Sequence, residues 1–174
     1  FAFWNPPLMD GAKTARRSAN TEAATLFSQL INREVRTIAF VRTRKQAELV
    51  YLYARGQLES VSPGMGSKIS PYRASYMPED RRRIERALFE GDLLGVATTN
   101  ALELGIDIGD LGATILAGYP GSIASAWQQA GRSGRRGERS LSILIGADNP
   151  LDQYLMRHPE AFFGKPQENA LISP

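Results

Sequence analysis

The segment QQAGRSGRRG, residues 128–137, combines glycines and arginines at helical spacing. Gly131 and Gly134 fall within or at the end of a helical pattern, where each glycine costs about 1 kcal/mol relative to alanine. They flank Arg132 and Arg135, which are three residues apart and therefore share one helical face. Small residues beside two planar cations allow a backbone to approach phosphates closely. The segment therefore predicts a phosphate-binding site; the alternative is a frayed helix end whose arginines face solvent.

A second segment with candidate chemistry is TNALELGIDIGDL, residues 99–111. Thr99 and Asn100 follow an apolar strand pattern and open a short helix, whose free backbone N–H groups can bind an anion. Gly105 allows the chain to turn, and Asp107 comes two residues later, where a carboxylate could accept hydrogen bonds from a ribose. The alternative is structural, with Thr99 as a helix cap and Asp107 as a turn residue.

Alternating apolar strands and amphipathic helices must position these segments. Strands are expected at residues 37–41, 69–73, 93–98, 113–119 and 141–146. Helices are expected at residues 20–34, 44–55, 78–90 and 123–135 and between Asn149 and Pro159, with Asn20 and Thr43 as N-caps, and residues 56–67 are expected to form an exposed loop. This order predicts the α/β class, with a central parallel sheet flanked by helices.

Ligands of such sheets bind at the carboxyl ends of the strands. Arg42, Thr43, Arg73 and Thr99 all lie near expected strand ends, so we expect them on one rim, where they can hold phosphates. For Arg42 and Arg73, ordinary solvated surface is the alternative. The net charge is only +3, but 17 of the 21 basic residues are arginine, the planar cation that favours a phosphate or nucleic-acid partner.

Length and composition exclude several classes of protein. The 174 residues suffice for one domain, expected over residues 1–160, and residues 161–174 are expected to be a linker toward a missing C-terminal domain. A start on Phe1 inside an apolar stretch suggests a piece of a longer protein. Cysteine is absent and there is one histidine, so neither a disulfide frame nor a metal site is expected. With no membrane span or secretion signal in the sequence, a cytoplasmic protein is expected.

Four segments, in order along the chain, resemble the second RecA-like domain of superfamily 2 DEAD/DEAH-box helicases. TIAFVRTRKQAELV resembles motif IV, SPYRASYMPEDRRRIERALFEGDL the segment after it, VATTNALELGIDIGDL motif V, and WQQAGRSGRRG motif VI. Stretches such as NALELGID and GYPGSIASAWQQAGR look closest to the bacterial helicases of mitomycin-repair type, which are related to RecQ-like enzymes. The resemblance covers essentially the whole chain and implies a RecA-like three-layer fold.

The resemblance also implies roles for individual residues. Arg135 matches the arginine finger on the ATP γ-phosphate, Arg132 the second phosphate contact, and Gln128 the opening polar residue of motif VI. In motif V, Asp107 and Gly105 match the nucleotide-binding turn.

Thr99 matches a residue that touches the nucleic-acid backbone, and Arg42, Thr43 and Arg73 complete the expected nucleic-acid contacts. Two positions depart from relatives: Arg73 stands where RecQ-like enzymes often have histidine, and Gln129 stands where DEAD-box RNA helicases have arginine.

The expected function is the C-terminal motor lobe of an ATP-dependent DNA helicase, moving 3′ to 5′ and acting in DNA repair. Its expected partners are single-stranded or tailed duplex DNA and the N-terminal RecA-like domain of the same protein. That domain would make most of the contacts to the cofactors, ATP and Mg²⁺. A zinc-binding domain downstream is implied as well. The sequence contains no GxxxxGK[ST], so this chain alone is not expected to hydrolyse ATP. The alternatives are an RNA helicase lobe, a translocase that does not unwind, and a nucleotide-binding module that does not hydrolyse.

Overall fold

The computed structural model describes the chain except residues 10, 12–14, 104–107, 109–110, 135–138 and 165–174. Its strands are β1 (Ala2–Trp4), β2 (Thr37–Phe40), β3 (Ile69–Tyr72), β4 (Gly95–Thr98), β5 (Ala113–Ala117) and β6 (Leu141–Ile145). Its helices are α1 (Ala19–Asn32), α2 (Arg44–Val61), α3 (Pro78–Glu90), α4 (Ile123–Ala130), α5 (Pro150–Arg157) and α6 (Glu160–Phe163), with 3-10 turns η1 (Met65–Lys68) and η2 (Asn100–Leu102).

The strands form one sheet in the order β1-β6-β5-β2-β4-β3, and every neighbouring pair is parallel. The register aligns the last residues of the strands: Phe40 of β2 pairs with Thr98 of β4 and with Leu116 of β5, and Thr98 also pairs with Tyr72 of β3. The segments that follow these strands therefore leave the sheet at one edge, as the sequence predicts.

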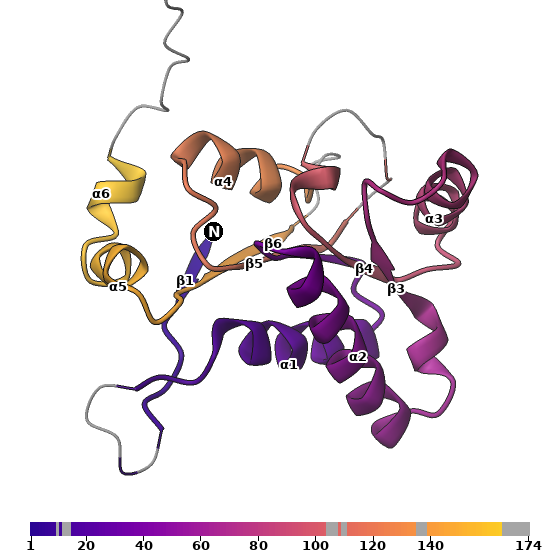
Figure 1. Cartoon of the computed structure of the whole chain (residues 1–174), viewed down its shortest axis with the longest axis horizontal. Helices are drawn as coiled ribbons and strands as arrows, with labels where there is room; N and C mark the ends of the chain where they lie inside the picture. The colour runs from indigo at the N-terminus through magenta and orange to yellow at the C-terminus, as the bar shows by residue number, and fades with distance from the viewer. Residues whose placement is uncertain (10, 12–14, 104–107, 109–110, 135–138, 165–174) are drawn as a thin grey trace, which may run out of the picture.

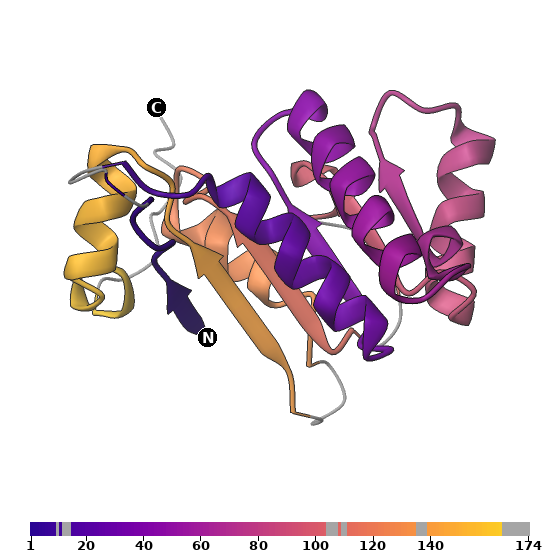
Figure 2. The ribbon, with the colours of Figure 1, turned by 90° about the horizontal axis from the view of Figure 1, so that it is seen from below.

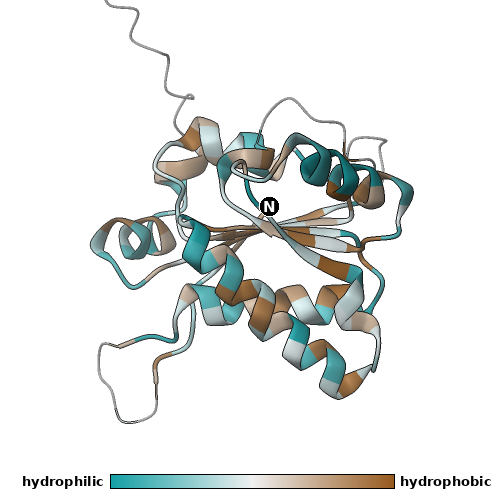
Figure 3. Ribbon diagram, turned by 45° about the vertical axis from the view of Figure 1, so that its right-hand side comes forward, coloured by the Kyte–Doolittle hydropathy of each residue, from teal (hydrophilic) through white to brown (hydrophobic). Residues whose placement is uncertain are grey.

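Helices cover both faces of the sheet (Figures 1 and 2). On one face α1 and α2 pack through Phe27, Ile31 and Val50, all fully buried. On the other face α3, α4 and α5 pack through residues such as Leu88, Ala126 and Leu155. In Figure 3 hydrophobic residues recur along α1 and α2 between hydrophilic ones, as one-sided burial requires. The predicted three-layer α/β architecture is therefore present.

The longest helix corrects one prediction. Residues 56–61, expected in an exposed loop, instead complete α2, and Gly56 lies inside the helix. A single glycine in a helix costs about 1 kcal/mol, which the buried Ala54 and Leu58 on either side can offset by packing on the sheet. The expected cap is correct: Thr43 accepts a hydrogen bond from the Gln46 N–H, in a full capping box.

Other boundaries differ at the ends of elements. α1 begins after Ser18 rather than Asn20, and α4 ends at Ala130 rather than running to residue 135. Strand β1 was not predicted, because three residues carry too little periodicity to detect.

The start of the expected linker is also different. Residues 160–163 form α6, and Phe162 is fully buried against Phe3, Tyr119 and Trp127. This aromatic contact fixes the chain to the domain up to at least Phe163, and residues 165–174 lie outside the described part.

Candidate nucleic-acid interface

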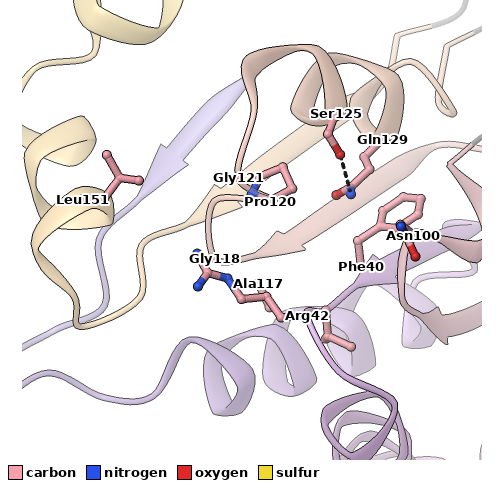
Figure 4. Close-up of a pocket in the computed structure, with 11 residues that line it drawn as sticks. Phe40, Arg42, Asn100, Ala117, Gly118, Pro120, Gly121, Ser125, Gln129 and Leu151 are labelled. Atoms are coloured by element: carbon pink, nitrogen blue, oxygen red, sulfur yellow. Dashed lines mark hydrogen bonds between the residues drawn. The ribbon is translucent and has the colours of Figure 1, made fainter. Parts of the chain in front are cut away.

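A pocket of about 500 Å³ opens at the carboxyl ends of β2 and β5 (Figure 4). Its polar groups are one cation, Arg42, and three neutral side chains, Asn100, Ser125 and Gln129. The other lining residues are Phe40, Val41, Ala117, Gly118, Pro120, Gly121 and Leu151. Among these described residues none is acidic, so the pocket suits an anionic ligand such as a phosphate.

Arg42 follows β2 and is held on two sides. Its Nη2 donates a hydrogen bond of 2.6 Å to the carbonyl oxygen of Tyr119, which follows β5. The same nitrogen lies 3.5 Å from Oδ1 of Asp152, at the start of α5. The Arg42 side chain is nevertheless 49% exposed, whereas that of Asp152 is 1% exposed. Arg42 therefore presents a fixed and half-exposed guanidinium to the pocket.

The residues after β4 contribute unequally. Thr99 is half-buried and precedes η2 without a capping hydrogen bond from its side chain, so its hydroxyl has no structural task as a cap. Its neighbour Asn100 is exposed and lines the pocket.

Thr43 lies at the same edge of the sheet but has a local role. Its hydroxyl oxygen accepts the Gln46 N–H at 3.2 Å, and the Gln46 side chain accepts the Thr43 N–H at 3.0 Å. Thr43 is exposed, but it is not among the residues that line the pocket. The structure therefore accounts for Thr43 as the cap that begins α2 directly after Arg42.

Arg73 follows β3 and lies outside the pocket. Its Nη2 forms an ion pair with Glu48 of α2, and its guanidinium lies 5.8 Å from the ring centre of Tyr76. Burial is the main cause that raises the pKa of Tyr76. Beside Arg73, burial and a hydrogen bond to Glu85 raise the pKa of Tyr72 to about 12. The ion pair with Glu48 partly neutralises the charge of Arg73 within the fold.

Two glutamine positions of the motif VI segment face in different directions. Gln128, the expected nucleotide contact, is exposed on α4. Gln129 is 5% exposed and lines the pocket, and its Nε2 donates to Oε2 of Glu103 at 2.9 Å. The same oxygen accepts the Ser125 hydroxyl at 2.7 Å. The Glu103 carboxylate thus connects the segment after β4 to α4.

Arg132 is buried rather than extended toward solvent. It is 5% exposed, and its Nε and Nη2 donate to the carbonyl oxygen of Glu103 at 2.9 and 2.5 Å. A phosphate contact by Arg132 would therefore require its guanidinium to leave or share this carbonyl. The other expected nucleotide contacts, Gly105, Asp107 and Arg135, lie outside the described residues.

Several residues of the site were not predicted from the sequence. Glu103 belongs to the motif V segment, but nothing in the spacing indicates that its side chain reaches Ser125 and Gln129, 22 and 26 residues away. Asp152 follows the Asn149-Pro150 helix start, and that pattern signals only a helix. For Gln129, the spacing of four residues from Ser125 was an available signal that the two share a face of α4.

The described residues hold neither a metal cluster nor a membrane-spanning helix. In the described part of the chain, no three His, Cys, Asp or Glu side chains gather as metal ligands. None of the described helices has the length and apolar character that a membrane crossing requires.

Comparison with known proteins identifies similar chains. Residues 22–137 match the family described as "Helicase conserved C-terminal domain". The chain is 48% identical over 175 residues to the uncharacterized ATP-dependent helicase YprA of Bacillus subtilis, covering 100% of this chain and 23% of that protein. It is 42% identical to the ATP-dependent helicase HRQ1 of Saccharomyces cerevisiae, covering 91% of this chain and 15% of that protein. The chain therefore spans less than a quarter of the length of these relatives.

A solved helicase structure is also similar to this chain. The crystal structure of the DUF1998 helicase MrfA bound to DNA and AMPPNP superposes with a TM-score of 0.91 at 46% sequence identity, covering 99% of this chain and 24% of that one. Together with the six parallel strands, this similarity shows that the expected RecA-like helicase fold is correct.

Proposed function

Because the chain belongs to the helicase conserved C-terminal domain family, we propose that it is the C-terminal motor lobe of an ATP-dependent DNA helicase. In this proposal the lobe holds part of the single-stranded DNA track and supplies cationic groups to ATP bound mainly by an N-terminal RecA-like domain. The whole activity belongs to a longer protein of the kind that YprA and HRQ1 represent.

The observation that carries the DNA part of the proposal is the Arg42 pocket. Arg42 is half-exposed, is fixed by Tyr119, and lies in a pocket without acidic side chains among its described lining residues. A motor that moves along DNA of any sequence must hold phosphates rather than read bases. Asn100 adds a neutral polar contact at the same edge, and Thr99 is proposed to touch the backbone beside it. The DNA bound to MrfA supports DNA as the nucleic acid.

Arg73 and Thr43 remain weaker parts of the proposed DNA track. The Arg73 charge is already paired with Glu48, and the Thr43 oxygen already caps α2. Their proposed contribution is to extend the rim on which Arg42 and Thr99 lie.

The nucleotide part of the proposal rests on motifs V and VI. Arg135 is proposed as the arginine finger, with Arg132 as a second phosphate contact, Gln128 at the opening of the motif, and Asp107 and Gly105 at the ribose. ATP with Mg²⁺ supplies the phosphoryl group that is transferred to water. An arginine brought across a domain cleft stabilises the charge of that transfer by about 4 to 7 kcal/mol. The AMPPNP in the MrfA crystal supports the use of ATP.

The deciding experiment compares DNA binding by the wild-type chain and an Arg42→Ala variant. Fluorescence anisotropy of a labelled oligothymidylate should give a Kd of about 10⁻⁴ to 10⁻⁶ M for the wild type, and affinity should fall with salt. Arg42→Ala should weaken binding. It should also make the negative slope of the log association constant against log salt concentration less steep by about 0.7, the value for one single-strand phosphate. Arg33→Ala is the matched control, because Arg33 is exposed and directly follows α1. It precedes the amino end of β2, whereas the pocket lies at the carboxyl end of that strand. Equal effects of the two substitutions would contradict the proposed DNA site.

The finer parts of the proposal are movement from 3′ to 5′, a role in DNA repair and a downstream zinc-binding domain. They follow from the resemblance alone. Strand displacement by a full-length protein containing this chain, on tailed DNA and RNA duplexes of both polarities, tests polarity and nucleic-acid type together. Displacement of RNA only would favour the RNA helicase alternative, and ATP turnover without displacement would favour a translocase.

A further inference from the structure

Asp152 is a buried carboxylate that belongs to none of the helicase-like motifs. It lies in the first turn of α5, where its own N–H donates to the side chain of the N-cap Asn149. Its Oδ2 accepts two backbone N–H groups, from Tyr119 at 3.0 Å and from Ala147 at 2.8 Å. Because these amides follow β5 and β6, one carboxylate oxygen joins the ends of two neighbouring strands.

The other oxygen of Asp152 faces Arg42. Oδ1 lies 3.5 Å from Nη2 of Arg42, and that nitrogen also donates to the Tyr119 carbonyl. The backbone passes close to both side chains at Gly118, where a Cβ atom would lie 3.4 Å from Arg42 Nε and 3.4 Å from Asp152 Oδ2. Gly118 also has a φ of +91°, a conformation that glycine adopts without strain. Arg42, Gly118 and Asp152 therefore form one packed unit at the wall of the pocket.

We propose that Asp152 is a positioning residue that orients the Arg42 guanidinium toward the DNA backbone. Its contacts to Tyr119 and Ala147 fix the carboxylate, the carboxylate and the Tyr119 carbonyl fix Nη2, and the rest of the half-exposed guanidinium is left for a phosphate. This inference rests on the proposed function, because it assigns Arg42 to DNA. The competing explanation is that Asp152 only joins the ends of β5 and β6 and that its proximity to Arg42 has no effect on DNA.

An Asp152→Asn substitution separates the two explanations. The amide oxygen of asparagine has two lone pairs and can accept both backbone N–H groups, so the connection between the strand ends is kept. The amide nitrogen would then face Arg42 with donors instead of an acceptor. Removal of a negative charge next to DNA should by itself strengthen binding. If Asp152 positions Arg42, Asp152→Asn should therefore weaken DNA binding, whereas the loss of charge alone should strengthen it.

The experiment is a double-mutant cycle on the 174-residue chain, with Asp152→Asn, Arg42→Ala and the double variant, measured by anisotropy with a labelled oligothymidylate. We expect Asp152→Asn to weaken binding by about threefold or more in the wild-type background, the lower end of coupling between residues in contact, and to have almost no effect after Arg42→Ala. The matched control is Asp148→Asn, which removes an exposed carboxylate from the loop just before α5 and should leave binding unchanged or slightly tighter.

Several results would overturn the inference. If Asp152→Asn tightens binding, or weakens it equally with and without Arg42, then Asp152 does not act through Arg42. If Arg42→Ala itself has no effect, the proposed DNA site fails instead, so the two failures are distinguishable.

A measurement on the wild type covers the case in which Asp152→Asn does not fold. Rotation about the Nε–Cζ bond of Arg42, followed by ¹⁵N NMR, should be slower than that of the exposed Arg33. Equally fast rotation would show that the Arg42 guanidinium is not held, and would overturn the inference.

Discussion

Glu103 accepts two side-chain hydrogen bonds from α4, and its replacement by alanine should destabilise the fold measurably. The substitution leaves the Nε2 group of Gln129 without its 2.9 Å partner, and Gln129 is 5% exposed, so water cannot fully replace the bond. A buried donor without a partner costs about 1–3 kcal/mol. Ser125 Oγ lies 3.4 Å from the same nitrogen and can still accept a weak hydrogen bond from it. Because this contact partly compensates, we expect a loss near the lower end of that range.

The size of the effect follows from chain length and can be checked by thermal unfolding. For a domain of 150–250 residues, 1 kcal/mol shifts Tm by about 2–4 °C, so a loss of about 1–2 kcal/mol should lower Tm by about 2–8 °C. Arg132 donates to the backbone carbonyl of Glu103, so its contact survives the substitution. The measured loss therefore belongs to the carboxylate and its two partners.

Two further variants make the prediction refutable. Glu103→Gln keeps an oxygen that can accept from both Ser125 and Gln129, so its loss should be clearly smaller than that of Glu103→Ala. In a Glu103→Ala/Gln129→Ala double variant the unpaired donor is gone, so the total loss should be less than the sum of the single losses. An unchanged Tm in Glu103→Ala, or strict additivity in the double variant, would show that the Glu103 carboxylate does not stabilise the fold through Gln129.

Three other predictions concern the core, a buried tyrosine and the nucleotide site. Gly95→Ala should destabilise the fold by about 1–3 kcal/mol in urea unfolding, because the new Cβ would lie 2.6 Å from atoms of both Phe27 and Ile31; Gly56→Ala, which meets nothing within 4 Å inside α2, should instead stabilise it by about 0.5–1 kcal/mol. The pKa of Tyr72 is raised from its ordinary value of 10.0 to about 12, so the folded state holds this proton more tightly. The contribution of Tyr72 to stability should therefore be constant below pH 10 and be lost between pH 10 and 12. In Tyr72→Phe this part of the fall should be missing from unfolding curves measured across that range. Arg135→Ala in a full-length protein should lower ATP turnover by about 10³-fold or more while nucleotide binding persists, and unchanged turnover would exclude the arginine finger.

Local sequence signals predicted most of the fold because most elements depend on local interactions. The Thr43 capping box and the Pro78 start of α3 are satisfied within a few residues of the signal, and both are present. The errors arose where distant packing outweighed a local preference. α2 continues through Gly56 because the residues beyond it pack on the sheet, and the aromatic contacts of Phe162 bring residues 160–163 into the fold.

The site was predictable to the extent that the topology alone determines it. A parallel sheet places every segment that follows a strand at one edge, so the order of strands and helices suffices to assign Arg42 and Thr99 to a common rim. The sheet does not determine which of these side chains is free to bind. That depends on partners far along the chain: Glu48 neutralises Arg73 across 25 residues, whereas Asp152 and Tyr119 hold Arg42 across 110 and 77 residues and still leave it half-exposed. Two arginines that both follow strands at this edge of the sheet therefore differ in their exposure and in their partners, and the order of strands and helices does not reveal that difference.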